Sequence, residues 1–328
     1  MGNSHPSAMS LFRKKLAVLF PIIVLCVWMF GGCGSGVGGD VEEMPLSNKL
    51  VVVTTTTQVT DMVKSVAGNR LRLIPLMGPG VDPHLYKPSA KDAAALSKAN
   101  LIFYSGLMLE GRMEDVFAKA DTKAYAVTKN LSEETLLHPD DFVGHPDPHV
   151  WFDPEIWVKC IDVVRDGLIE ADPAGKEIYV TNAETLKTEY LAVADWAKAR
   201  IAELSKESRK MVTSHDAFNY FGRAFGIEVM AVQGISTATE AGLADRVAMV
   251  DYVKRHGVKA IFVESSVNPA TIEEIARETG MRVGGELFSD AMGESGKMER
   301  GFAGEEYDVG TWAGMMKHNV NVLVEALK

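Results

Sequence analysis

The stretch of residues 176–208 constrains the fold most, because it contains neither Gly nor Pro. Apolar side chains recur in it at three- and four-residue steps, at Leu186, Tyr190, Ala194, Ala197, Ile201 and Leu204. This spacing predicts one long helix with a single buried face. About thirty helical residues span about 45 Å, the size of a domain. We therefore expect a rigid helix that joins two folded parts and resists wide opening between them.

Apolar runs alternate with helical patterns on both sides of this stretch. Before it, we expect strands at 49–53, 71–76 and 101–104, with one helix at 58–67 and a second that Ser89 caps and that runs to residue 99. After it, we expect strands at 210–213, 228–232, 260–263 and 282–287, with helices at 215–225, 242–256, 269–279 and 311–328. This alternation predicts an α/β fold with parallel sheets in two lobes joined by one long backbone helix. The boundaries are 49–173 for the N-terminal lobe, 174–208 for the linking helix and 209–328 for the C-terminal lobe.

The first residues read as a targeting segment. Arg13, Lys14 and Lys15 precede an apolar run at 16–30, and small residues then lead to Cys33. This predicts a secretory signal at 1–32, and the small residues before Cys33 resemble a bacterial lipobox. Lipidated Cys33 would anchor the chain outside the cytoplasm, on the periplasmic face of the membrane or at the cell surface. Residues 33–48 then form a flexible tether. The alternative is an uncleaved membrane anchor with an ordinary Cys33.

Composition limits the partners. The chain has 34 basic and 44 acidic residues, a net charge of −10, which disfavours nucleic acid as a partner. After signal removal only Cys33 and Cys160 remain, so no internal disulfide is expected if Cys33 carries the lipid. We interpret Cys160, in an amphipathic helical stretch, as a small core residue.

Four segments place metal-binding side chains in loops or near the ends of expected strands. They are Asp82-Pro83-His84, residues 148–154 with His149, residues 214–216 with His215, and residues 286–290 with Asp290. Ligands of open α/β sheets bind outside the carboxyl ends of strands, which places this set in the cleft between the lobes. Imidazoles with one carboxylate suit Zn²⁺ or Mn²⁺. Each residue alone has a plainer role, as a turn residue (His84), a helix start (His215) or a cap (Asp290).

The order of these motifs resembles the TroA-like (cluster A-I) metal-binding lipoproteins of bacterial ABC importers. The matching runs are 82–84, 148–154, 214–221, 233–237, 261–265 and 285–290. The resemblance implies metal ligation by His84, His149, His215 and Asp290. It also implies a monomer that captures Zn²⁺ or Mn²⁺ as transported cargo and delivers it to a permease and its ATPase.

Metal identity stays open at this point. In the family that the chain resembles, manganese-dedicated members tend to carry Glu at the position of His215, and zinc-dedicated members keep His. Members with three His and one Asp occur with either metal, although nitrogen-rich sites favour Zn²⁺ in affinity. Other functions remain as alternatives: a surface adhesin with a structural metal, or a metallohydrolase. The sequence contains no GxSxG, Walker A or HExxH motif, so we expect no enzyme.

The remaining candidates are weaker. Glu264 ends an expected strand, where it either orients a ligand His or is a surface carboxylate. His138 and His145 lie in an Asp-containing loop that is either simply exposed or a weak metal collector. His256 ends a helix, which favours a cation, and His318 is expected to be structural.

Overall fold

The computed structural model describes residues 49–111, 113–119, 121–140, 142–302 and 304–328, which belong to one compact unit. The expected signal segment, Cys33 and the tether lie outside these residues. Among the helices of the described residues, none combines the length and apolar character needed to cross a membrane.

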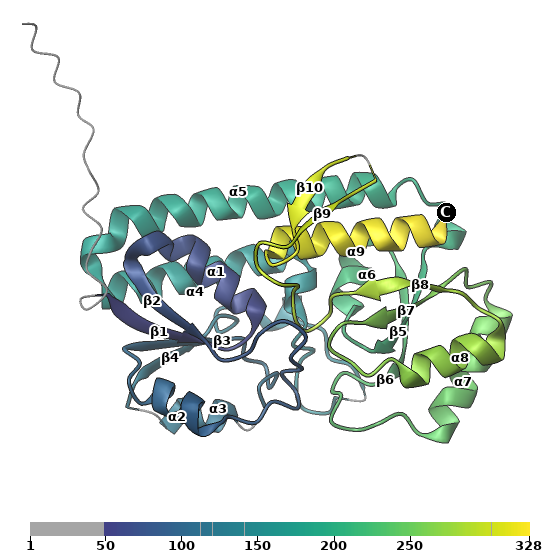
Figure 1. Ribbon diagram of the computed structural model, residues 1–328, viewed down its shortest axis with the longest axis horizontal. Coiled ribbons are helices and arrows are strands. Elements are labelled where there is room, and N and C mark those ends of the chain that lie inside the picture. Colours follow the sequence, from purple (N-terminus) through teal and green to yellow (C-terminus); the bar gives the residue numbers. More distant parts are fainter. Residues whose placement is uncertain (1–48, 112, 120, 141, 303) are drawn as a thin grey trace, which may run out of the picture. The chain divides into compact units, whose positions relative to one another are not determined.

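The N-terminal lobe is built on a four-stranded parallel sheet in the order β2-β1-β3-β4 (Figure 1). Its strands are β1 (Leu50–Thr54), β2 (Leu71–Pro75), β3 (Leu101–Tyr104) and β4 (Lys123–Ala126). Its helices are α1 (Thr57–Ala67), α2 (Ala90–Leu96), α3 (Met113–Lys119) and α4 (Pro154–Ala171). Val52, Val53 and Phe103 in the two central strands are fully buried, as in a parallel sheet covered on both faces.

Local signals fix where helices of this lobe begin. Thr56 caps α1 by accepting the N–H of Val59. Ser89 caps α2 in a reciprocal pair with Asp92, so the expected cap is confirmed, although α2 ends at Leu96 rather than at residue 99. These starts set the lengths of the loops between strands and helices, which carry the site described below.

The C-terminal lobe contains two parallel strand pairs that lie side by side (Figure 1). β5 (Lys210–His215) pairs with β6 (Glu228–Gln233), and β7 (Ile261–Glu264) pairs with β8 (Val283–Leu287), with β5 next to β7. The helices of this lobe are α6 (Asn219–Phe225), α7 (Leu243–Arg255) and α8 (Ala270–Thr279). The expected βα alternation is therefore present in both lobes.

The structure corrects the expected helix at 215–225. His215 is the last residue of β5, opposite Gln233 of β6, and α6 begins only at Asn219. The N–H groups of Ser214 and His215 bond to the carboxylate of Glu264 on β7, which holds this segment extended. His215 therefore ends a strand and does not start a helix.

The long helix α5 (Lys176–Ile201) runs beside both lobes together with the C-terminal helix α9 (Trp312–Leu327) (Figure 1). Helix α5 ends seven residues before the expected boundary at residue 208. Arg209 donates to the Leu204 carbonyl, which Ser208 would bond in a continued helix, and residues 206–208 form a short 3₁₀ turn. The sequence also gave no sign of the antiparallel pair β9 (Met298–Arg300) and β10 (Glu306–Asp308), because these strands are short and charged.

A shared core joins the two lobes and α5. Trp312 of α9 lies with its ring centroid 4.0 Å from that of Tyr190 on α5. The Trp312 indole donates to the Trp151 carbonyl, and the Trp151 indole donates to the Ser289 carbonyl of the C-terminal lobe. Cys160 is a fully buried free thiol in the same core, as expected. Because these side chains are buried and closely packed, we expect this part of the interlobe contact to be rigid.

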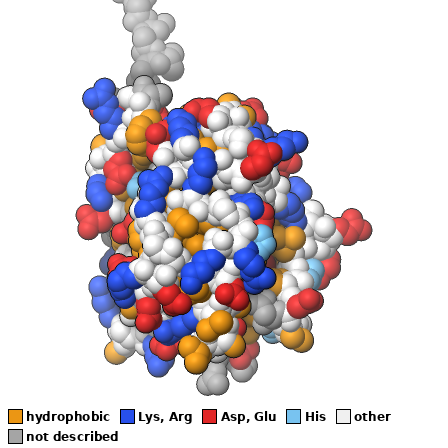
Figure 2. Space-filling view, turned by 90° about the vertical axis from the view of Figure 1, so that its right-hand side faces the viewer, with side chains coloured by type: hydrophobic (Ala, Val, Ile, Leu, Met, Phe, Trp, Pro, Cys, Tyr) orange, Lys and Arg blue, Asp and Glu red, His pale blue; other side chains and the backbone are white. Residues whose placement is uncertain are grey.

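On the face drawn in Figure 2, acidic and basic side chains lie interspersed with small apolar areas. The net negative charge of the chain is therefore not gathered into a single acidic patch on that face.

Candidate metal site

The structure brings the four expected side chains to one point between the lobes. The potential ligand atoms of His84, His149, His215 and Asp290 all lie within 4.8 Å of one another. His84 lies in the loop after β2 and His149 in the loop between β4 and α4, while His215 ends β5 and Asp290 follows β8. Each lobe supplies two of them from beyond the carboxyl ends of its strands.

The separations match the edges of a small coordination polyhedron. His149 Nε2 is 3.3 Å from both His84 Nε2 and Asp290 Oδ1, and His215 Nε2 is 3.2 Å from Asp290 Oδ2. A fourth separation, from His84 Nε2 to Asp290 Oδ2, is longer, at 4.0 Å. A tetrahedral ion with ligands at about 2.0–2.1 Å has edges of about 3.3–3.4 Å.

These atoms are buried without the partners that buried polar atoms need. His215 Nε2 and both Asp290 carboxylate oxygens have no hydrogen bond of regular geometry, and they lie 3.2–3.3 Å from other members of the same cluster. His149 and His215 are fully buried, and the His84 side chain is 2% exposed. Orphaned buried donors and acceptors cost free energy, and three of them facing one point indicate a site built for a cation.

Two carboxylates hold the imidazoles from behind. Glu264 Oε2 lies 2.5 Å from His215 Nδ1, and Asp147 Oδ1 lies 2.7 Å from His149 Nδ1. Glu264 is 3% exposed and Asp147 fully buried, so Glu264 is not a surface carboxylate. Each contact fixes the ring and directs its Nε2 to the shared point.

Asp147 was not identified from the sequence, although a signal was present. The run Asp147-Pro148-His149 repeats Asp82-Pro83-His84. In both runs the Asp Oδ1 accepts the N–H of the His two residues later, at 2.9 and 2.8 Å. The shared Asp-Pro-His pattern could have indicated that the carboxylate positions the histidine.

Burial and neighbouring charges give the three imidazoles different pKa values. Burial lowers the pKa of His84 to about 3. Burial also opposes the charged form of His149, but Asp147 and Asp290 outweigh it and raise its pKa to about 9. Asp290 and Glu264 likewise outweigh burial at His215 and hold its pKa well above the ordinary value. Without metal, the site therefore balances the Asp290 carboxylate with protons on His149 and His215.

Three further histidines of the described residues lie apart from this group. His138 is exposed and pairs with Glu133, with Nε2 3.1 Å from Oε1. His256 caps the end of α7 and bonds to the Tyr252 carbonyl. His318 contacts Glu299 through Nδ1 at 2.7 Å, as expected for a structural residue. Within the described residues, the group of His84, His149, His215 and Asp290 is the one cluster that could hold a metal.

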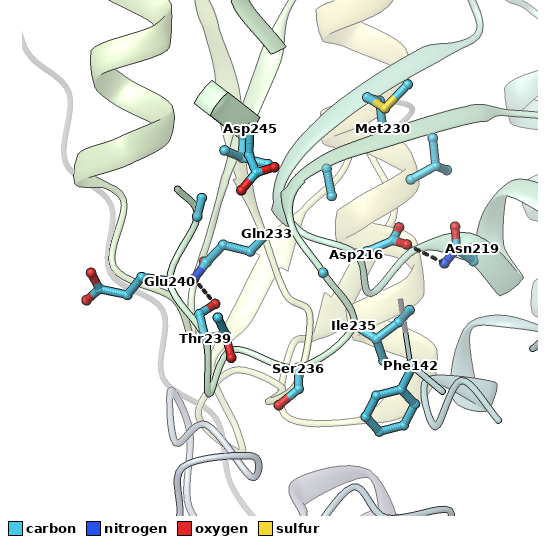
Figure 3. Close-up of a pocket in the computed structure, with 15 residues that line it drawn as sticks. Phe142, Asp216, Asn219, Met230, Gln233, Ile235, Ser236, Thr239, Glu240 and Asp245 are labelled. Carbon is cyan, nitrogen blue, oxygen red and sulfur yellow. Dashed lines mark hydrogen bonds between the residues drawn. The ribbon is translucent and has the colours of Figure 1, made fainter. Parts of the chain in front are cut away.

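Two hollows flank the site on the outside. One, of about 580 Å³, is lined by His84, His145, Phe142, Ser236 and apolar side chains of the N-terminal lobe. The other, of about 670 Å³, lies beside β6 and the loop after it, and Asp216, Asn219 and Glu240 face it (Figure 3). His145 therefore lies near His84, the most exposed member of the site, although the structure does not place it among the clustered side chains.

Comparisons with known proteins agree with this geometry. A family model described as the zinc-uptake complex component A, periplasmic, matches residues 52–326. The manganese-binding lipoprotein MntA of Bacillus subtilis is 36% identical over 316 residues, covering 94% of this chain and 99% of that protein. The zinc-binding protein TroA of Treponema pallidum is also 36% identical, over 313 residues, covering 93% of this chain and 96% of that protein.

A solved structure shares the fold. The periplasmic zinc-binding protein TroA of Treponema pallidum superposes with a TM-score of 0.80 at 35% sequence identity, covering 85% of this chain and 99% of that one. The two relatives of equal identity carry the names of different metals, one manganese and one zinc.

Proposed function

This chain belongs to the family of periplasmic zinc-uptake components, and we propose that it captures Zn²⁺ or Mn²⁺ at His84, His149, His215 and Asp290 for an ABC importer. It is a solute-binding protein and not an enzyme. Two relatives are named as substrate-binding lipoproteins of manganese or metal ABC transporters, and a third as a manganese-binding lipoprotein. The metal is its cargo, so binding and release are its activity.

One observation carries the proposal: His215 Nε2 and both Asp290 oxygens are buried, face one point and lack hydrogen-bond partners. Three nitrogen donors and one oxygen donor match a four-coordinate Zn²⁺ site. If both Asp290 oxygens bind, the site becomes five-coordinate, which Mn²⁺ accepts. Four protein ligands leave no open position for a catalytic water.

Delivery requires partners beyond the metal. We propose that the chain acts as a monomer outside the cytoplasm, anchored to the membrane by lipid on Cys33, with residues 1–32 as signal and 33–48 as tether. It would dock on a permease driven by an ATPase, and docking would weaken ligation to release the ion. The lobes would correspond to 49–173 and 209–328, joined by the helical segment 174–208.

Titration of the metal-free protein by calorimetry tests the ligand set. We expect one equivalent of Zn²⁺ to bind to the native chain, and His149→Ala to weaken binding by at least 100-fold, because it removes a ligand and the imidazole that Asp147 holds in place. His256→Ala, at the exposed end of α7, is the matched control and should bind as the native chain does. Equal affinity in His149→Ala and the native chain would refute the site.

A further inference from the structure

We propose that the Thr237 hydroxyl latches the metal site shut by holding the loop of His84 from the opposite lobe, and that it controls how fast the ion leaves. The inference rests on the proposed function, since it concerns release from the same site. It assigns to Thr237 a positioning role without contact to the metal.

The latch is a single short hydrogen bond across the cleft. Thr237 Oγ1 donates to Asp82 Oδ2 at 2.6 Å, and Thr237 is only 8% exposed. The other oxygen of the same carboxylate, Asp82 Oδ1, accepts the N–H of His84 at 2.8 Å. One carboxylate therefore connects a C-terminal-lobe hydroxyl to the backbone of a candidate ligand.

The loop of His84 has little else to hold it to the C-terminal lobe. Within the described residues, the bond from Thr237 is the one hydrogen bond between residues 78–86 and that lobe. Gly80, with φ of +71°, lies near the Ser265 carbonyl, since an added Cβ would stand at an ordinary van der Waals distance of 3.6 Å from it, and this contact is not a hydrogen bond. Loss of the Thr237 bond would leave the loop in van der Waals contact with that lobe, apart from the 4.0 Å approach of His84 Nε2 to Asp290 Oδ2 and the metal itself.

The rest of the interlobe contact consists of buried hydrogen bonds and packed side chains that hold the lobes together. Trp151 and Gln58 of the N-terminal lobe both donate to the Ser289 carbonyl deep in the interface. Trp312 joins the same core from α9. We therefore expect the metal ion to leave through a movement of the surface loops, while the buried contacts between the lobes stay closed.

The loop that carries Thr237 has room to move away. Residues 234–242 border the hollow of about 670 Å³ on their outer side, where the exposed Thr239 and Glu240 line it (Figure 3). One side-chain bond ties the loop to β6, from Gln233 Nε2 to the Thr239 carbonyl at 3.3 Å. Ser236 also lines the second hollow, outside His84, so the loop separates two open spaces. A shift of this loop into the hollow would break the latch and free the His84 loop.

The latch predicts an effect on dissociation more than on association. The bond from Thr237 to the Asp82 carboxylate stabilises only the closed state, because it breaks when the loop opens. A variant without this bond therefore populates the open state more. We expect the dissociation rate to rise about tenfold or more, with an association rate within about threefold of the native value.

Stopped-flow dissociation of Zn²⁺-loaded protein into excess EDTA tests this with three variants. Thr237→Val keeps the shape and removes the donor, and should dissociate about tenfold faster. Thr237→Ser keeps a hydroxyl and should stay within about threefold of the native rate. Thr239→Val, on the exposed side of the same loop, is the control and should match the native protein.

Each outcome decides the proposal. A Thr237→Val rate within twofold of native overturns the latch while leaving the metal site intact. Equal acceleration in Thr237→Ser and Thr237→Val also overturns it, because the effect would then not depend on the hydroxyl. If the native chain takes up no Zn²⁺ before the EDTA step, the proposed function itself fails and the latch fails with it.

Discussion

The Glu264 carboxylate lies against His215 through both of its oxygens. Oε2 is 2.5 Å from the ring Nδ1, and Oε1 accepts the N–H of His215 at 2.9 Å. The same oxygen accepts the N–H of Ser214 at 2.8 Å. The Glu264 side chain of β7 therefore binds the last two residues of β5 and orients His215. The imidazole can then present only Nε2 to Asp290.

Replacing Glu264 should therefore weaken metal binding although it is no ligand. We expect Glu264→Gln to lower Zn²⁺ affinity by about 10- to 100-fold, because the ring loses its charged acceptor. Isothermal titration measures this directly. Glu299→Gln is the matched control, since it alters a His–Glu pair, with His318, that lies away from the site. Loss of affinity in both variants alike would contradict a specific role for Glu264.

Asp147 should have the corresponding effect on His149. Asp147→Asn removes the negative charge that raises the pKa of His149 to about 9, so that pKa should fall. NMR titration of the metal-free protein follows the ring, and calorimetry should show roughly tenfold weaker Zn²⁺ binding. Asp140→Asn, at an exposed position of the same loop, should change neither quantity. An unchanged His149 pKa in Asp147→Asn would refute this assignment.

The sequence predicted the main elements of the fold because their signals are local. Apolar runs and the Ser89 cap lie within a few residues of the elements they specify. Helix α5 was placed too long because its end depends on Arg209 reaching back to Leu204, a contact that no periodicity reports. The short charged strands β9 and β10 carry no alternation that would reveal them.

The site, like the fold, has some features that the sequence predicts and others that it does not. Four candidate ligands could be named from ordered motifs, and the structure brings these four together. For Glu264 the sequence allowed two interpretations, a residue that orients a ligand His or a surface carboxylate. The sequence could not decide between them, because Glu264 and His215 are 49 residues apart in the chain. The bond between Asp82 and Thr237 spans 155 residues and follows from how the two lobes meet, which a single sequence does not encode in any local pattern.

Metal affinity should fall on acidification, beginning above the ordinary imidazole range. Because the pKa of His149 is about 9 and that of His215 is raised well above 6.5, Zn²⁺ must displace a proton from each ring below those values. Affinity should decrease as pH falls through the raised pKa values of these two rings, by up to about 100-fold per unit where both rings hold a proton. The pKa of unperturbed imidazole alone would place this fall only below about pH 6.5.

Calorimetry in buffers of different ionisation enthalpy checks the proton count. We expect about two protons to be released per Zn²⁺ at pH 7, from His149 and His215, and none from His84, whose pKa is about 3. Zn²⁺ affinity that is equal at pH 8 and pH 6 would contradict ligation by these imidazoles.

Zn²⁺ should bind more tightly than Mn²⁺ in solution, because nitrogen-rich sites follow the order of intrinsic metal affinity. Replacing His215 with a carboxylate residue should lower the ratio of Zn²⁺ affinity to Mn²⁺ affinity by tenfold or more. Since Glu264 lies 2.5 Å from His215 Nδ1, His215→Glu alone would place two carboxylates together, and the double variant with Glu264→Gln relieves the repulsion. Competition between the two ions, with Glu264→Gln alone as control, measures the change. Tighter Mn²⁺ binding by the native chain would refute the stated order.

Anomalous diffraction from crystals of the Zn²⁺-loaded chain tests the central claim most directly. The account predicts a single strong peak about 2.0–2.2 Å from His84 Nε2, His149 Nε2, His215 Nε2 and an oxygen of Asp290. A peak elsewhere, or one that leaves any of these four residues beyond bonding distance, would contradict it.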